Sequence, residues 1–185
     1  MPKTILRDAE ARMKKSVEAT SRDFSHVRTG RASASLLDGI QVEYYGAKNP
    51  INQVATVTVP EPRLIVIQPW DKTIVKEIEK AIGRSDLGLN PNSDGTVIRL
   101  QIPELTTERR RELTKHVSKI AEEGKVSIRN IRREANDALK KLEKAKTISE
   151  DERHTYEAEV QQLTDKYIKH IDDLLKAKEE ELLEI

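Results

Sequence analysis

Arginines are concentrated in one short stretch of this sequence, IRNIRREANDALKK, which covers residues 128–141. If the stretch is helical, its three arginines and an asparagine fall within about 100° of arc and face away from an apolar seam. A guanidinium is planar and grips a phosphate with two parallel hydrogen bonds. A row of such groups on a rigid helix therefore indicates binding to a structured nucleic acid. The polar set is Arg129, Arg132, Arg133 and Asn136, and the seam is Ile128, Ile131 and Ala135.

The net charge of the 185-residue chain is only +1, but the charge is unevenly distributed. Residues 106–146 hold 13 basic and 7 acidic side chains, whereas residues 147–185 hold 5 basic and 12 acidic ones. A basic helix and an acidic helix would also attract each other, so charge alone equally favours an ordinary solvated coiled-coil face. The choice of arginine favours phosphate binding, because lysine would be enough for solubility.

Three segments have apolar residues spaced by three or four positions, which predicts long amphipathic helices over residues 4–30, 106–146 and 149–185. Gly30 is expected to end the first helix, and Ser149 with Glu152 forms a capping-box pattern that begins the third. At Gly124 an extra four-residue step interrupts the apolar repeat of the second helix. Helices with such narrow seams are stable only when packed together, which favours an antiparallel bundle.

Residues 31–105 differ from both flanks, because they hold five of the seven glycines and six of the seven prolines. Short runs rich in β-branched residues predict strands at 40–45, 54–59, 64–69 and 96–102, and a helix is expected over 71–82. The predicted fold class is therefore α+β: an elongated antiparallel three-helix bundle (1–30 and 106–185) with a small β/α/β domain (31–105) inserted between its first two helices. The two links are predicted to be hinges. Their residues are Gly30, Arg31, Pro103, Glu104, Leu105 and Thr106.

Several function classes find no support in the sequence. There is no cysteine, and the four histidines lack metal-ligand spacing, so neither a metal site nor a cofactor is expected. No set of nucleophile, base and orienting residue is recognisable, so we do not expect an enzyme. The sequence shows no signal-peptide pattern and no apolar run of membrane-spanning length. A soluble cytoplasmic protein is the default expectation.

Six motifs occur in order along nearly the whole chain and together resemble the bacterial ribosome recycling factor family. They are VRTGRASASLLDGIQVEYYG (27–46), RSDLGLNPNSDG (84–95), TTERRREL (106–113), IRNIRREAND (128–137), ISEDE (148–152) and QQLTDKYI (161–168). The resemblance implies a monomeric translation factor with an outline like that of a tRNA. Such a factor binds the large subunit and its ribosomal RNA after termination. With elongation factor G and GTP hydrolysis by that partner, it splits the subunits for another round of protein synthesis.

The resemblance also implies which residues contact RNA. Arg132 is the leading candidate, with Arg129 and Arg133 beside it. The motifs VRTGRAS and TTERRREL contribute further candidates, which are Arg28, Arg31, Arg109 and Arg110.

Two other protein classes remain open from the residues alone. One is a coiled-coil scaffold or chaperone without ribosomal RNA binding, which would show little salt-sensitive affinity for RNA. The other is a DNA-binding regulator, which would usually have a dimer seam and a recognition helix with base-reading side chains. Binding to isolated large subunits at two salt concentrations separates the three classes.

Overall fold

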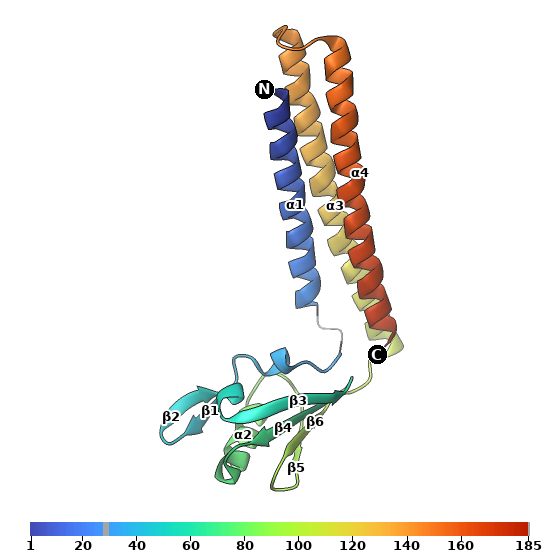
Figure 1. The fold of residues 1–185 in the computed structure, drawn as a ribbon. Helices are drawn as coiled ribbons and strands as arrows, with labels where there is room; N and C mark the ends of the chain where they lie inside the picture. Colours follow the sequence, from blue (N-terminus) through green and yellow to red (C-terminus); the bar gives the residue numbers. More distant parts are fainter. Residues whose placement is uncertain (28–29, 185) are drawn as a thin grey trace. The chain divides into compact units, whose positions relative to one another are not determined.

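The protein divides into two compact units in the computed structural model, which describes residues 1–27 and 30–184. One unit contains three long helices, which lie side by side with α3 antiparallel to both α1 and α4 (Figure 1). The second unit contains all the strands and one short helix. The predicted α+β class, with a helical bundle and a small sheet domain, is confirmed. The long helices are α1 (Pro2–His26), α3 (Thr107–Lys144) and α4 (Glu150–Leu183).

The bundle is held together by one apolar seam from each helix. Burial of these side chains supplies most of the free energy that keeps long helices folded, because helix propensity alone is weak. Small residues sit on α3 where the three helices approach closely, notably Gly124 and Ala135. Fully buried seam residues include Met13 of α1, Val117, Ile128 and Leu139 of α3, and Val160 and Ile171 of α4.

The helix ends follow the sequence signals in one case and depart from them in another. The capping box at the start of α4 is confirmed, since Ser149 Oγ accepts the amide of Glu152 at 3.1 Å and Glu152 Oε2 accepts the amide of Ser149 at 2.9 Å. The prediction that Gly30 ends the first helix is wrong. Helix α1 ends at His26, because Val27 already has an extended backbone (φ −75°, ψ 115°).

The small unit is built on a four-stranded antiparallel sheet of order β3-β4-β6-β5. Helix α2 (Val75–Gly83) buries Ile78 and Ile82 in one core with strand residues such as Ile65 and Leu100. Three short 3₁₀ helices complete the unit, at Ala34–Leu37, Ile51–Gln53 and Lys72–Ile74. The sheet strands are β3 (Ala55–Glu61), β4 (Leu64–Pro69), β5 (Pro91–Ser93) and β6 (Ile98–Gln101), and a separate hairpin pairs β1 (Gln41–Tyr44) with β2 (Ala47–Pro50).

The sequence predicted four of the six strands and missed β2 and β5. Both missed strands are short, polar and contain proline, at Pro50 and Pro91 respectively. Each lies at the edge of its sheet, where proline is tolerated because one side of the strand needs no ladder hydrogen bond. None of the helices among the described residues is both long enough and apolar enough to cross a membrane.

Candidate nucleic-acid interface

Helix α3 is covered by its two neighbours on different sides. Toward α1, the hydroxyl oxygens of Ser127 and Ser16 lie 2.9 Å apart. Toward α4, Lys125 forms an ion pair with Asp172. Because side chains advance by about 100° per residue around an α-helix, these contacts leave one sector of α3 facing solvent.

We call this sector the open face of α3. Its residues are exposed, apart from Arg129, whose side chain is 37% exposed. Basic residues predominate in it, which gives the face a positive potential that attracts anions. The open face consists of Arg111, Lys115, Lys119, Glu122, Val126, Arg129, Arg133, Asp137, Lys140 and Lys144.

Arg133 is the arginine of this region whose charge is most available. Its side chain is exposed, and it makes no hydrogen bond or ion pair with any residue in the described part of the chain. All five N–H donors of its guanidinium can therefore meet a phosphate without first breaking a protein contact. Arg129, one turn earlier, is partly neutralised because its Nη1 lies 2.9 Å from Glu122 Oε1 on the same face.

Arg132 lies at the boundary between α3 and α4 and not on the open face. Its side chain is half-buried, and Nη1 donates a hydrogen bond of 3.4 Å to Oε1 of Gln161 on α4. The expectation that all three arginines face away from the packed seam is therefore wrong for Arg132. Because consecutive residues are separated by about 100° around the helix axis, Arg132 lies on the α4 side of the helix whereas Arg133 lies on the open face.

Two of the remaining predicted arginines lie elsewhere on α3, and a third belongs to the other unit. Arg109 and Arg110 lie about 30 Å before Arg129 along α3, at a rise of about 1.5 Å per residue. Arg109 Nη1 pairs with Glu112 Oε2 at 3.0 Å, and Arg110 is half-buried. Arg31 is exposed and belongs to the small unit. Arg28 lies outside the described residues.

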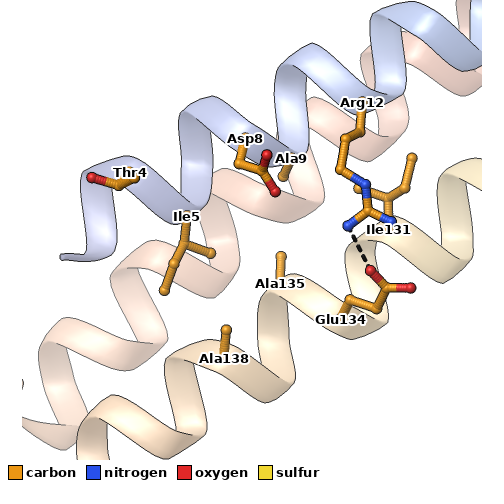
Figure 2. A pocket seen from close by; sticks show the side chains of 9 residues that line it. All are labelled: Thr4, Ile5, Asp8, Ala9, Arg12, Ile131, Glu134, Ala135 and Ala138. Carbon is orange, nitrogen blue, oxygen red and sulfur yellow. Dashed lines mark hydrogen bonds and ion pairs between the residues drawn. The ribbon is translucent and has the colours of Figure 1, made fainter.

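A groove between α1 and α3 is not a second phosphate site. Figure 2 shows that Arg12 of α1 points toward Glu134 of α3, and the two form an ion pair of 2.5 Å. The hydrogen bond from Arg12 lowers the pKa of the Glu134 carboxyl, so the pair remains charged and mutually compensated at neutral pH. The rest of the 360 Å³ groove is lined mainly by apolar and small side chains, such as Ile5, Ala9 and Ala135.

Sequence reasoning missed the lysines that extend the open face along α3. Lys115, Lys119 and Lys144 share the sector of Arg133, but they lie outside the arginine-rich stretch of residues 128–141. The available signal was their helical spacing relative to the apolar seam. Gln161 was also missed, because nothing in one sequence tells which residue of α4 faces Arg132.

Comparison with known proteins places this chain in one family. The family model described as ribosome recycling factor matches residues 20–183. The ribosome-recycling factor of Symbiobacterium thermophilum is 56% identical over 185 residues, which is all of both chains.

Two solved structures are similar over almost the whole length. A solution structure of the ribosome recycling factor has a TM-score of 0.71 and 48% identity, and covers 100% of this chain and 98% of that one. A second structure describes the T. thermophilus ribosome recycling factor and E. coli elongation factor G bound to the E. coli post-termination complex. It has a TM-score of 0.62 and 50% identity, and covers 99% of each chain. From its motifs, its fold and these full-length matches, the chain belongs to the ribosome recycling factor family.

Proposed function

We propose that this chain recycles ribosomes after termination by binding ribosomal RNA of the large subunit through the open face of α3 and the adjacent Arg132. The observation that carries the proposal is the guanidinium of Arg133, which has no carboxylate partner among the described residues and lies on the same rigid helix as Arg129 and Arg132. Phosphate oxygens are the ligands that suit such groups, and a rigid rod matches the shape of a folded RNA better than it matches splayed bases.

The partner in the proposal is elongation factor G. Support comes from the T. thermophilus relative, which is described with E. coli elongation factor G on the post-termination complex. We infer that GTP hydrolysis belongs to that partner and that this chain transmits the resulting motion. The chain itself is then a binding protein and not an enzyme.

Two short links are proposed to act as hinges between the bundle and the small unit. Gly30 has φ of +77°, and a Cβ added there would lie 3.1 Å from the Cγ and Cδ2 atoms of Leu105. The two links are therefore in contact with each other at a position that favours glycine. Arg31, Pro103, Glu104 and Thr106 complete the proposed hinge, and a hinge of a few terminal residues is sufficient for a domain rotation.

The proposal is tested by light scattering from post-termination ribosomes. Scattering should fall, as the subunits separate, when the chain, elongation factor G and GTP are all present, and should stay high when any one is omitted. A nonhydrolysable GTP analogue is the control for the role of hydrolysis. Scattering that does not depend on the chain would favour the scaffold or chaperone class instead.

A further inference from the structure

The side chain that faces Arg132 across the helix boundary is a neutral amide. We propose that Gln161 positions the Arg132 guanidinium for an anionic ligand while leaving its positive charge uncompensated. The inference rests on the proposed function, in which the anion is a phosphate of large-subunit RNA. Gln161 is a positioning residue in this account, because it acts through Arg132 and not on the ligand.

The orientation of the Gln161 amide is set from both sides. Its Nε2 donates a hydrogen bond of 2.8 Å to Oδ1 of Asp165, one turn later on α4. Its Oε1 accepts the hydrogen bond from Arg132. A carboxylate only accepts and a guanidinium only donates, so the reversed amide would lose both bonds. Asp165 therefore keeps the carbonyl oxygen of Gln161 directed at Arg132.

Neighbouring cations of the bundle are held differently. Contacts between helices at Lys125, Arg12 and Arg153 are each made to a carboxylate, on Asp172, Glu134 and Glu143 respectively. A carboxylate fixes a cation and also cancels its field. It would therefore compete directly with a phosphate for the same N–H groups.

A neutral acceptor such as the Gln161 amide fixes the position of the cation without cancelling its field. A hydrogen bond to Gln161 restricts the rotamers of a long side chain, whose ordering otherwise reduces binding affinity. One N–H of the guanidinium is used, and the others remain available to an anion. Arg132 and Arg133 thus both lack a direct carboxylate partner among the described residues, although only Arg133 lies on the open face.

The test replaces Gln161 in two ways and uses its neighbour as a control. Gln161→Glu puts a negative charge beside Arg132, whereas Gln161→Met removes the acceptor without adding charge. Gln162→Glu makes the same change in net charge at an exposed position whose side chain has no hydrogen bond or ion pair with the described residues. Affinity for isolated large subunits is measured against salt concentration, and the melting temperature of each free variant is measured in parallel.

Gln161→Glu should weaken binding about five- to tenfold and reduce the slope of log affinity against log salt by about one unit, because one phosphate contact is neutralised. Its melting temperature should stay within about 2 °C, since an exposed ion pair contributes little to stability. Gln161→Met should weaken binding about two- to threefold with an unchanged slope, because only side-chain ordering is lost. Gln162→Glu should change affinity less than about twofold.

Equal effects of Gln161→Glu and Gln162→Glu would overturn the inference, and so would full affinity in Gln161→Met. Loss of melting temperature in both Gln161 variants with an unchanged salt slope would show a purely structural role. Arg132→Ala separates this failure from that of the proposed function. If Arg132→Ala weakens binding while Gln161→Glu does not, only the positioning role is wrong. If Arg132→Ala binds normally, the proposed RNA contact at Arg132 is wrong as well.

Discussion

At the scale of single residues, the basic side chains differ mainly in what neutralises them. Arg12 and Arg129 have carboxylate partners, Arg132 has an amide partner, and the Arg133 side chain makes no hydrogen bond or ion pair with the described residues. A count of charges treats these groups as equal, but the free energy of binding a phosphate differs from one group to the next. The groups that do not first have to give up a carboxylate should dominate binding to RNA.

Tyr167 gives a prediction that concerns folding alone. The side chain is 4% exposed, and its hydroxyl donates a hydrogen bond of 2.8 Å to Glu10 Oε1. Burial, with a smaller contribution from Glu10, raises the pKa of Tyr167 to about 12. The unfolded chain releases this proton near pH 10 whereas the folded chain keeps it, so the contribution of Tyr167 to stability is complete below pH 10 and is lost as the pH rises toward 12.

The measurement compares the free energy of unfolding of the wild type and of Tyr167→Phe from pH 7 to pH 12. Below pH 10 the variant should be less stable by about 1 kcal/mol, the usual contribution of one hydrogen bond. This difference should shrink and then reverse between pH 10 and pH 12, because phenylalanine does not titrate. A difference that stays constant over the whole range would show that the Tyr167 hydroxyl ionises equally in both states.

Sequence reasoning reached part of the residue-scale picture. The helical period correctly placed Arg133 away from the seam, because that relation depends only on α3. It misplaced Arg132, since the sector that α4 covers depends on how two helices pack. The Gln161–Asp165 pair could have been noticed as an i,i+4 pair on one helix, but its role depends on a contact 29 positions away in the sequence.

At the scale of elements, the close approach of three helices depends on Gly124. A Cβ added there would overlap Oγ1 of Thr20 on α1 and lie 3.0 Å from Cδ1 of Ile171 on α4. The extra four-residue step in the apolar repeat of α3 therefore marks the point where both neighbours press against the backbone. The sequence of α3 alone shows that its apolar repeat is interrupted, but only the packing of α1 and α4 against Gly124 shows the cause.

Gly124→Ala should destabilise the bundle by about 1–2 kcal/mol in chemical denaturation, because overpacking outweighs the helix-propensity gain of about 1 kcal/mol. Gly83→Ala is the matched control, since Gly83 is also helical and nothing lies within 4 Å of the added Cβ. It should be neutral or slightly stabilising. Thr20→Ala combined with Gly124→Ala should recover much of the loss, and the absence of such coupling would refute the steric explanation.

The elements themselves were predictable to different degrees. Long helices repeat their signal over many turns, and a capping box such as that at Ser149 marks an end directly. Strands β2 and β5 are polar, contain proline and lack β-branched residues, whereas β1 and β6, each also only four residues long, lie in runs that contain them. Strands β2 and β5 are extended because they pair with neighbouring strands, and not because of their own β propensity.

At the scale of the whole molecule, the proposed division of labour is that the bundle binds RNA and the links let the small unit move. Gly30→Ala should stiffen one link, because alanine disfavours φ of +77° and its Cβ would contact Leu105. Affinity for large subunits should stay within about threefold, whereas splitting with elongation factor G should slow by about tenfold. The two activities are measured on the same preparation by equilibrium binding and by light scattering.

Gly39→Ala is the control for backbone strain in the small unit. Gly39 has φ of +82°, but nothing lies within 4 Å of its added Cβ. It should slow splitting much less than Gly30→Ala does. Similar effects of the two variants, or an equal loss of binding and splitting in Gly30→Ala, would mean that Gly30 serves folding and not hinge motion.

Binding of large-subunit RNA to the open face of α3, with Arg132 at its edge, is tested by the salt dependence of affinity. Log affinity should fall steeply and linearly with log salt, and Arg133→Ala should reduce that slope by about one unit. Arg7→Ala removes an equal charge from an exposed position on α1 and should leave the slope unchanged. A flat salt profile for the wild type, or the same slope in Arg133→Ala as in Arg7→Ala, would mean that the open face does not bind RNA phosphates.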